Sequence, residues 1–439
     1  MKYSSTRLSS FAFSTAVVLL SVWPCFANPF YIGRFDGLRS GALNQSAFST
    51  YWNPAGLTKQ DTRLNLHVLG VNRRALFDRY AEENNVPDEF AEANSGENTT
   101  GAFGLVPSAA VAHGLSLGDL ELGVGLVWFI DRAGKTKWKK NLAAPAEFPG
   151  AIDGPQRWAT INTQLLIMST GLGVGIGYRP WGLSIGATPV YNYTRLSTVR
   201  ARNPDSGDRL IDESGGLAEG RILFENGEAS ALSWILGARW QPAPNWALGL
   251  SWSSGISYDV EGQVHISFGR AEETHAQARF DLPVPQSLRL ELGMDLGTMM
   301  TLRPQVTWTE WSVFKKQEAV NIANGEVLLS QERNFSDVIS YRLACDLALN
   351  DELTLHATGQ FENGATPVET FEPGLAESNN WEIGLGASVQ LTDSVNLSAS
   401  FTWQQFVDVD VRNSVQQPTM NGYYTDARQY VTIDLEVSL

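Results

Sequence analysis

Apolar and polar residues alternate with a period of two along most of the chain after residue 60. In residues 120–130 every even position is apolar, whereas the odd positions begin with Glu121, Gly123 and Gly125. In residues 430–439 the odd positions are all apolar, and the even positions after Tyr430 are polar. Successive side chains of a strand point to opposite faces, so this pattern predicts β-strands with one apolar face. A soluble β-sandwich alternates in the same way, and the alternation alone leaves both folds open.

The connections between these strands alternate between short and long. The tight turns are expected at 116–119, 179–182, 242–245, 297–300, 350–351 and 392–394. The long polar connections are expected at 78–101, 132–156, 201–219, 317–335, 364–379 and 413–427. An up-and-down membrane barrel has short turns at one end and long loops at the other, which gives this order. A sandwich has no reason to keep its long loops at one end.

The pattern predicts fourteen antiparallel strands. Their expected ranges are 62–77, 103–115, 119–131, 157–178, 182–199, 220–241, 245–268, 277–296, 301–316, 336–349, 352–363, 380–391, 394–412 and 428–439. Residues 262–280 could be read as an extra strand, but an odd count would place the two ends of the barrel on opposite sides. We therefore treat them as extensions around a loop. Many strands exceed the 9–11 residues that a tilted span needs, so the barrel is expected to project beyond the bilayer.

Composition excludes several other classes. Charged residues make up 18% of the 439 residues, below the roughly 25% of soluble proteins, and no run of about 18 apolar residues follows the N-terminus. A net charge of −15 opposes binding to the phosphate backbone of a nucleic acid. With 40 glycines and 10% aromatic residues, the chain has the composition of an all-β transmembrane barrel.

The first residues read as a targeting segment. Lys2 and Arg7 precede an apolar stretch at 11–22, and small residues follow as far as Ala27. This is the layout of a secretory signal peptide, so we expect residues 1–27 to be removed. The mature chain would then keep one thiol, Cys345, which cannot form an intramolecular disulfide.

Residues 28–60 differ from the rest because they lack the period of two and are rich in apolar side chains. A ring of fourteen strands encloses a lumen that its own side chains need not fill. We expect residues 28–60 to form a plug inside the lumen and residues 61–439 to form the barrel. The alternative, a flexible tail, fits the apolar content poorly.

Residues 37–57, which contain Asn53-Pro54-Ala55, resemble the N-terminal signature of the FadL/TodX-type outer-membrane transport proteins. Residues 280–290 and 306–312 resemble the family's proline-containing strand start and its Trp-Ser pair, and residues 240–254 give a third match. The resemblance implies a fourteen-stranded barrel whose plug, called the hatch, carries the Asn-Pro-Ala motif. The chain departs from other outer-membrane barrels at Leu439, where an aromatic residue is usual.

The resemblance also implies function and location. Members import long-chain fatty acids or aromatic hydrocarbons through the outer membrane of Gram-negative bacteria. We expect passive uptake of hydrophobic molecules, most favourably long-chain fatty acids, by a monomer surrounded by membrane lipid and lipopolysaccharide, with no cofactor. Aromatic hydrocarbon uptake is the alternative within the same fold, and a general diffusion porin or an adhesin is an alternative outside it.

Several residues are candidates for the moving parts of such a channel. We expect Asn53 to hydrogen-bond the backbone of the barrel or hatch and Pro54 to fix the adjacent turn, with Ala55 completing the motif. Phe30, close to the new N-terminus, is expected to insert into the lumen as a latch. In the family, the third strand has a kink through which substrate leaves sideways.

Gly123 and Gly125 lie in the third predicted strand and would permit such a kink. The alternative is that small residues here only leave space in the lumen.

The residues that bind substrate are not identified by sequence. An arginine in the lumen could pair with a carboxylate, and the candidates are Arg157, Arg195, Arg289, Arg303 and Arg342, each of which could instead pair with an acidic residue of the lumen. No catalytic role is expected, because the Gly-x-Ser-x-Gly stretch at 114–118 lies at a hairpin and not at a strand-to-helix turn. The five histidines show no metal-ligand spacing, and no metal site is expected.

Overall fold

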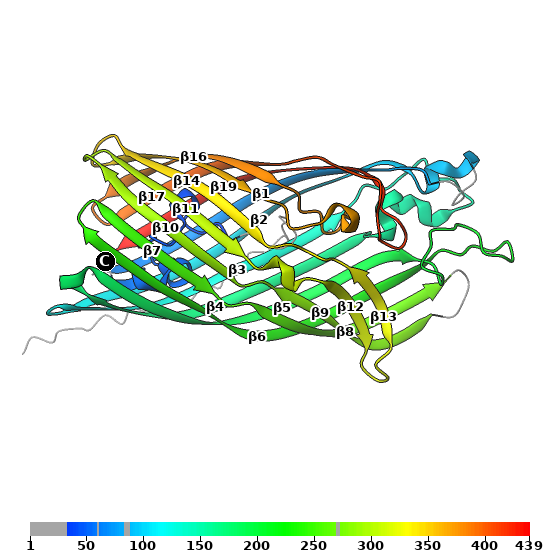
Figure 1. The fold of residues 1–439 in the computed structure, drawn as a ribbon, viewed down its shortest axis with the longest axis horizontal. Coiled ribbons are helices and arrows are strands. Elements are labelled where there is room, and N and C mark those ends of the chain that lie inside the picture. Colours follow the sequence, from blue (N-terminus) through cyan, green and yellow to red (C-terminus); the bar gives the residue numbers. More distant parts are fainter. Residues whose placement is uncertain (1–32, 59–60, 83–87, 269–272) are drawn as a thin grey trace, which may run out of the picture.

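The computed structural model describes residues 33–58, 61–82, 88–268 and 273–439. These residues form a long antiparallel barrel with strands inclined to its axis (Figure 1). The ring is closed by β1 (Thr62–Arg79) and β19 (Gly422–Ser438), which pair along almost their whole length, from Arg63↔Ser438 to Arg79↔Gly422. Among the described residues, no helix is long and apolar enough to cross a membrane.

The other strand segments follow in chain order around the wall. They are β2 (Gly96–Leu117), β3 (Leu120–Lys137), β4 (Asn162–Tyr178), β5 (Leu183–Arg202), β6 (Gly220–Ala243), β7 (Trp246–Ser253), β8 (Ile256–Phe268), β9 (Thr274–Val284), β10 (Ser287–Leu296), β11 (Met300–Thr309), β12 (Lys316–Asn321), β13 (Val327–Glu332), β14 (Val338–Ala348), β15 (Leu353–Glu362), β16 (Asn380–Thr392), β17 (Val395–Phe406) and β18 (Val409–Val411). The described residues thus hold nineteen segments in one sheet.

Nineteen segments make fourteen barrel strands, because five barrel strands are interrupted once each. β7 continues as β8, for example, and both pair with β6. Pro285 follows β9 and has no N–H to donate, which explains why the ladder stops there before β10 resumes it. The predicted count of fourteen is confirmed, and residues 262–280 are the extensions of two strands around a loop, as expected.

Short helical turns complete the fold. They are α1 (Ser49–Trp52) and the 3-10 turns η1 (Gly37–Arg39), η2 (Pro54–Thr58), η3 (Asp88–Ala93), η4 (Pro149–Asp153), η5 (Pro155–Trp158), η6 (Arg179–Trp181), η7 (Trp311–Val313) and η8 (Val368–Thr370).

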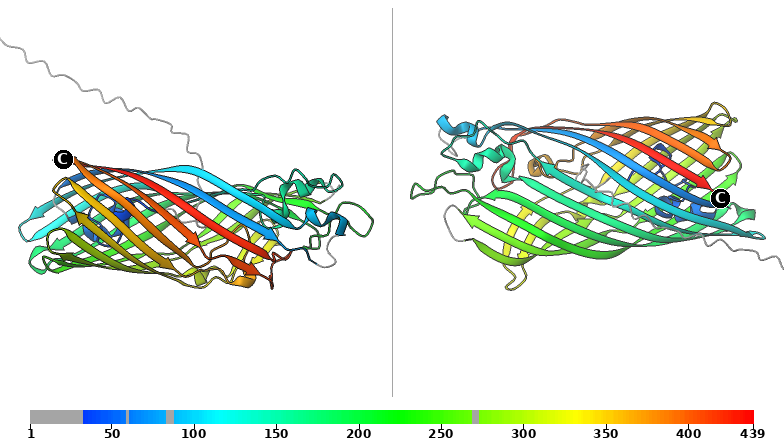
Figure 2. Two further views of the ribbon diagram at one scale, coloured as in Figure 1. Left: turned by 90° about the horizontal axis from the view of Figure 1, so that it is seen from above. Right: turned by 180° about the vertical axis from the view of Figure 1, so that it is seen from behind.

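All six expected tight turns lie at the end of the barrel that holds the C-terminus, and the long connections lie at the other end (Figures 1 and 2). One long connection was predicted wrongly. Residues 317–335 are not a polar loop, because β12 and β13 pair as a hairpin and extend the wall beyond β11 and β14. The predicted starts of the second and last strands are also too late, since β2 begins at Gly96 and β19 at Gly422.

Side chains of several connections pack together at the loop end of the barrel. Trp158 and Ala151 of the β3–β4 connection are fully buried, and they join a cluster that includes Phe371 from the β15–β16 connection and Met420 before β19. Burial of such large apolar side chains contributes about 1.5–3 kcal/mol each. These described connections are therefore held together by an apolar cluster of their own.

Candidate functional site

Residues 33–58, here called the inner segment, lie inside the barrel near the end with the tight turns (dark blue in Figure 2). Phe35, Phe48 and Trp52 form an aromatic cluster with the inward-facing Phe129 of β3. Phe35, Phe48 and Trp52 are at most 4% exposed. The apolar residues that predicted a plug are thus buried against the wall, and a flexible tail is excluded for this part of the chain.

Asn53 joins the inner segment to the wall. Its side-chain amide donates to the carbonyl oxygen of Ala42 at 2.6 Å and to that of Ala238 in β6 at 3.0 Å. Its Oδ1 accepts from the N–H of Ala55 at 3.1 Å, and Pro54 begins the following turn, η2. Asn53 was expected to hydrogen-bond the backbone of the barrel or of the hatch, and its amide bonds both.

Polar side chains of the wall hold the rest of the inner segment by its backbone. Glu291 accepts from the N–H of Leu43 at 2.7 Å, and Asn65 accepts from the N–H of Ala47 at 2.9 Å. Thr188 donates to the carbonyl of Thr50 at 2.8 Å. Hydrogen bonds from several separate strands thus hold the inner segment in one defined position.

Charged side chains of the wall also bind the inner segment. Arg34 pairs with Glu382 at 2.5 Å and lies over the ring of Tyr430. Arg342 donates to the carbonyl oxygens of Leu38 and Ser40.

Gly123 and Gly125 lie in a regular part of β3. They pair with Gly114 and Ala112 of β2 on one side and with β4 on the other. A Cβ at Gly123 would meet the carbonyl oxygen of Leu57 at 2.1 Å. The expectation of a kink at these glycines is wrong, and the alternative reading fits: the missing side chains make room for the inner segment.

The interruption of the wall lies later in β3. Its ladder with β2 ends at Ala109↔Trp128. The two segments meet again only at the far end, through the isolated bridge Thr100↔Trp138 and the bond from the N–H of Lys139 to the carbonyl oxygen of Thr99, among the described residues. Asp131 is the extra residue of a bulge against β4, and Pro107 of β2 has no N–H to offer. Residues 101–108 and 129–137 therefore face each other without ladder pairing.

Two cavities lie within the lumen. The first, with the adjoining open space, holds about 1660 Å³ not filled by atoms and lies against the inner segment at Arg34, Tyr51 and Trp52. Its lining is mixed and includes Arg132 and Glu362. The second, with its adjoining open space, holds about 800 Å³ and lies nearer the loop end.

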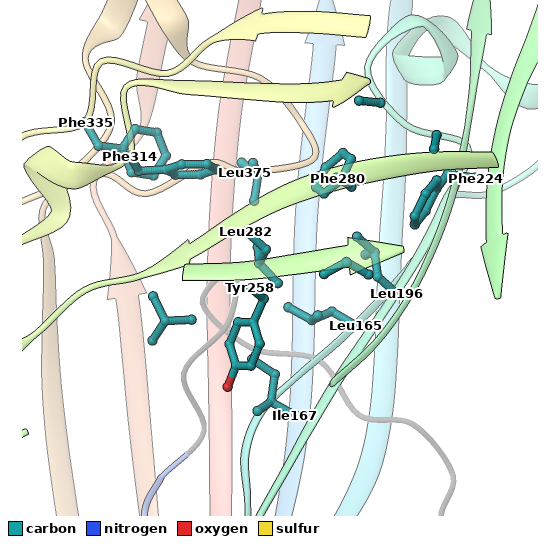
Figure 3. Close-up of a cluster of buried hydrophobic side chains, with 14 of the residues drawn as sticks. Leu165, Ile167, Leu196, Phe224, Tyr258, Phe280, Leu282, Phe314, Phe335 and Leu375 are labelled. Atoms are coloured by element: carbon teal, nitrogen blue, oxygen red, sulfur yellow. The ribbon is translucent and has the colours of Figure 1, made fainter. Parts of the chain in front are cut away.

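The second cavity has an apolar wall with charged groups at its edge. Figure 3 shows side chains of this wall, including Leu165, Leu196, Phe280, Leu282 and Leu375, which belong to one large buried cluster.

The charged residues that line that cavity are Arg73, Lys135, Arg200, Arg333 and Glu372. Arg333 pairs with Glu372 at 2.7 Å, whereas Arg200 hydrogen-bonds the side-chain oxygen of Gln331. The Nε of Arg200 is buried and has no hydrogen-bond partner among the described residues. An apolar cavity with a cation of this kind can hold a molecule with a long apolar part and one negative end.

The unpaired stretch of β3 borders both cavities. Phe129, Asp131 and Arg132 line the first, and Gly134 to Thr136 line the second. A molecule in either cavity therefore lies beside the part of the wall that lacks ladder bonds.

The arginines singled out by sequence have other partners. Arg157 pairs with Glu219, Arg195 with Glu228 and Arg303 with Asp346. Arg342 holds the inner segment, and Arg289 lies 5.0 Å from the ring centre of Trp52, which is on that segment.

Sequence reasoning missed Arg200. The alternation along β5 could have found it, because the even-numbered residues face inward, whereas Arg195 is on the exposed face. Phe30 and the signal segment 1–27 lie outside the described residues.

Comparison with known proteins agrees with this architecture. Residues 39–433 match the family described as outer membrane protein transport protein (OMPP1/FadL/TodX). No curated protein sequence matches the chain. The fold is similar to a Pseudomonas aeruginosa FadL homologue, with a TM-score of 0.74 and 15% identity over 95% of this chain and 99% of that one.

Two toluene transporters have similar folds. The Pseudomonas putida toluene transporter TodX gives a TM-score of 0.65 at 15% identity, over 90% of this chain and 95% of that one. The Ralstonia pickettii toluene transporter TbuX gives 0.61 at 14% identity, over 93% and 98%. Identities this low show the shared fold alone. The family match over most of the chain shows more: this protein belongs to the OMPP1/FadL/TodX family of outer-membrane β-barrel transport proteins.

Proposed function

We propose that this protein is a passive uptake channel for long-chain fatty acids. The observation that carries the proposal is the cavity whose lining combines an apolar wall, with Leu165, Phe280 and Leu375, and the buried guanidinium of Arg200. Each buried CH₂ group of an acyl chain contributes about 0.8 kcal/mol, which draws the chain out of water. The carboxylate end would then lie beside the guanidinium of Arg200, whose Nε has no protein partner among the described residues.

The inner segment acts as the hatch of this channel. A substrate held by its whole apolar length leaves only if a conformational change weakens the site. A few separate hydrogen bonds, such as those of Asn53, hold the segment to the wall. The chain makes the turn η2 at Pro54 and Ala55, so the segment can be released as a unit. Phe30, which lies outside the described residues, remains the predicted latch.

Release occurs through the unpaired stretch between β2 and β3. This stretch borders both cavities, and opening it breaks no ladder hydrogen bonds between residues 101–108 and 129–137. A hydrophobic molecule that leaves sideways enters lipid directly and avoids the water of the periplasm.

Aromatic hydrocarbon uptake is the second candidate, since the fold is also similar to toluene transporters. A hydrocarbon needs the apolar wall but no arginine. A general porin is the third, and the buried inner segment argues against it because it fills the lumen that a polar solute would cross.

Uptake in a strain without its own fatty acid transporter tests the proposal. Radiolabelled oleate, toluene and a small sugar are supplied to cells with and without this chain, at equal outer-membrane levels. Oleate uptake that depends on the chain is the expected result. Uptake of toluene without oleate would favour the second candidate, and sugar permeation alone would overturn both.

A further inference from the structure

A cluster of histidine and glutamate side chains lies on the outer face of the β8–β9 hairpin, away from the lumen. His265 and His275 are register partners on the two strands, and their ring centres are 4.6 Å apart. Glu273 follows the hairpin loop, with one carboxylate oxygen 3.6 Å from Nδ1 of His265 and the other 3.8 Å from Nε2 of His275. One ligand atom from each of these residues lies within 4.8 Å of the other two.

We propose that His265, Glu273 and His275 form a binding site for Zn²⁺. Ligand atoms on a tetrahedral zinc ion, with bonds of 2.0–2.2 Å, are about 3.3–3.5 Å apart. The two His–Glu separations, 3.6 and 3.8 Å, are somewhat longer and involve different oxygens of Glu273. All three ligand atoms lie within 4.8 Å of one another, so side-chain rotations are needed to bring them to one ion. Two imidazoles and a carboxylate suit Zn²⁺, whereas Ca²⁺ and Mg²⁺ prefer oxygen ligands.

Glu225 of the neighbouring strand β6 supplies a second observation. Its carboxylate oxygen lies 3.1 Å from Nε2 of His265. That nitrogen is buried and has no hydrogen-bond partner among the described residues, so Glu225 acts there through its negative charge, which favours a cation. Residues of β6, of β8 and of the start of β9 thus place two carboxylates and two imidazoles together.

The site is open to the surroundings of the cell. The residues of β8 that precede His265 on the same outward face are Asp259, Glu261 and Gln263, which are polar and exposed. Elsewhere the outward face is apolar, as at Leu232 and Trp234 of β6. The hairpin end therefore stands above the lipid, where a metal ion from outside can reach it, and a bound ion would tie the two strands together.

Zinc titration of the full chain, purified in detergent without a polyhistidine tag, tests the site. Isothermal titration is expected to show one Zn²⁺ per chain and no binding of Ca²⁺. His275→Ala and Glu273→Gln should each weaken binding by more than about tenfold, because changes to an outer partner alone cost 10–100-fold. Glu225→Gln removes one of the two negative charges and should weaken binding less than the substitutions of the ligands do.

His113→Ala is the matched control, because it removes an exposed histidine at the opposite end of the barrel and should leave zinc binding unchanged. Heat-modifiable electrophoretic mobility verifies that each variant is a folded barrel. The side chain of His275 is 60% exposed, so His275→Ala is the variant with the least effect on folding. Absence of stoichiometric zinc binding, or equal binding by wild type and His275→Ala, would overturn the proposal.

Discussion

The side-chain amide of Asn53 donates a hydrogen bond to the carbonyl oxygen of Ala238, which joins the inner segment to β6 five residues before that strand ends. The same amide also binds the carbonyl of Ala42 within the segment. One side chain therefore sets both the internal shape of the segment and its place on the wall. Both carbonyls would be left without this partner if the amide were removed.

Asn53→Ala should reduce uptake of the hydrophobic substrate. Loss of a buried hydrogen-bond partner costs about 1–3 kcal/mol, and here it loosens the segment that we propose as the moving hatch. The initial rate of uptake is measured at equal outer-membrane levels. Asn72→Ala is the control, since Asn72 bonds Gln429 on the exposed face of β1. Undiminished uptake by Asn53→Ala would rule out a gating role for this residue.

Gly186→Ala should displace the inner segment. A Cβ at this position would lie 2.4 Å from the backbone carbon of Pro54 and 2.7 Å from the nitrogen of Ala55. Backbone atoms cannot move aside as a flexible side chain does, so the segment must shift and the lumen should become leaky to a small sugar. Liposome swelling measures this leak. Gly359→Ala is the matched control, because its Cβ would meet nothing within 4 Å, and equal swelling by the two variants would contradict the prediction.

The fold was largely predictable because alternation depends only on the neighbouring residues in sequence. The alternation does not show which segment packs against the inner face of a strand. Gly123 was therefore assigned to a kink, whereas its missing side chain makes room for Leu57. The true interruption depends on how β3 pairs with its two neighbours, which is a tertiary property. Pro107 and the bulge at Asp131 are its physical causes, and only the proline is visible as a signal in the sequence.

The candidate site was less predictable than the fold. Arg200 and Arg195 are five residues apart on β5, and only the alternation of faces separates the buried one from the exposed one. His265 and His275 are brought together by the register of a hairpin, which their spacing in sequence does not reveal.

Deletion of Asp131 should close the unpaired stretch of the wall. The ladder of β3 with β4 steps from Ile130↔Met168 to Arg132↔Ile167, so removing the extra residue restores regular alternation. Residues 132–137 of β3 can then pair with β2. This closes the proposed exit, so uptake should fall several-fold. Deletion of Leu391, the extra residue of a bulge beside the β16–β17 turn, is the control. A chain without Asp131 that assembles normally and transports at the wild-type rate would contradict lateral release.

Arg200→Met should separate the two candidate substrates. Methionine keeps the apolar contacts of the arginine stem but removes the charge, and hydrogen bonds to charged groups contribute about 1.5–3 kcal/mol. The apparent affinity for oleate should therefore fall roughly tenfold or more, whereas toluene uptake should not change. Oleyl alcohol, which has no carboxylate, should be taken up equally by wild type and variant.

Arg195→Met is the matched control for this substitution, because Arg195 is on the exposed face of the same strand and pairs with Glu228 there. It should leave uptake of all three compounds unchanged. Equal losses of oleate and toluene uptake in Arg200→Met would indicate that the arginine only supports the cavity wall through Gln331. A loss confined to oleate would instead place the carboxylate beside Arg200, because only that compound carries a charge for the guanidinium to bind.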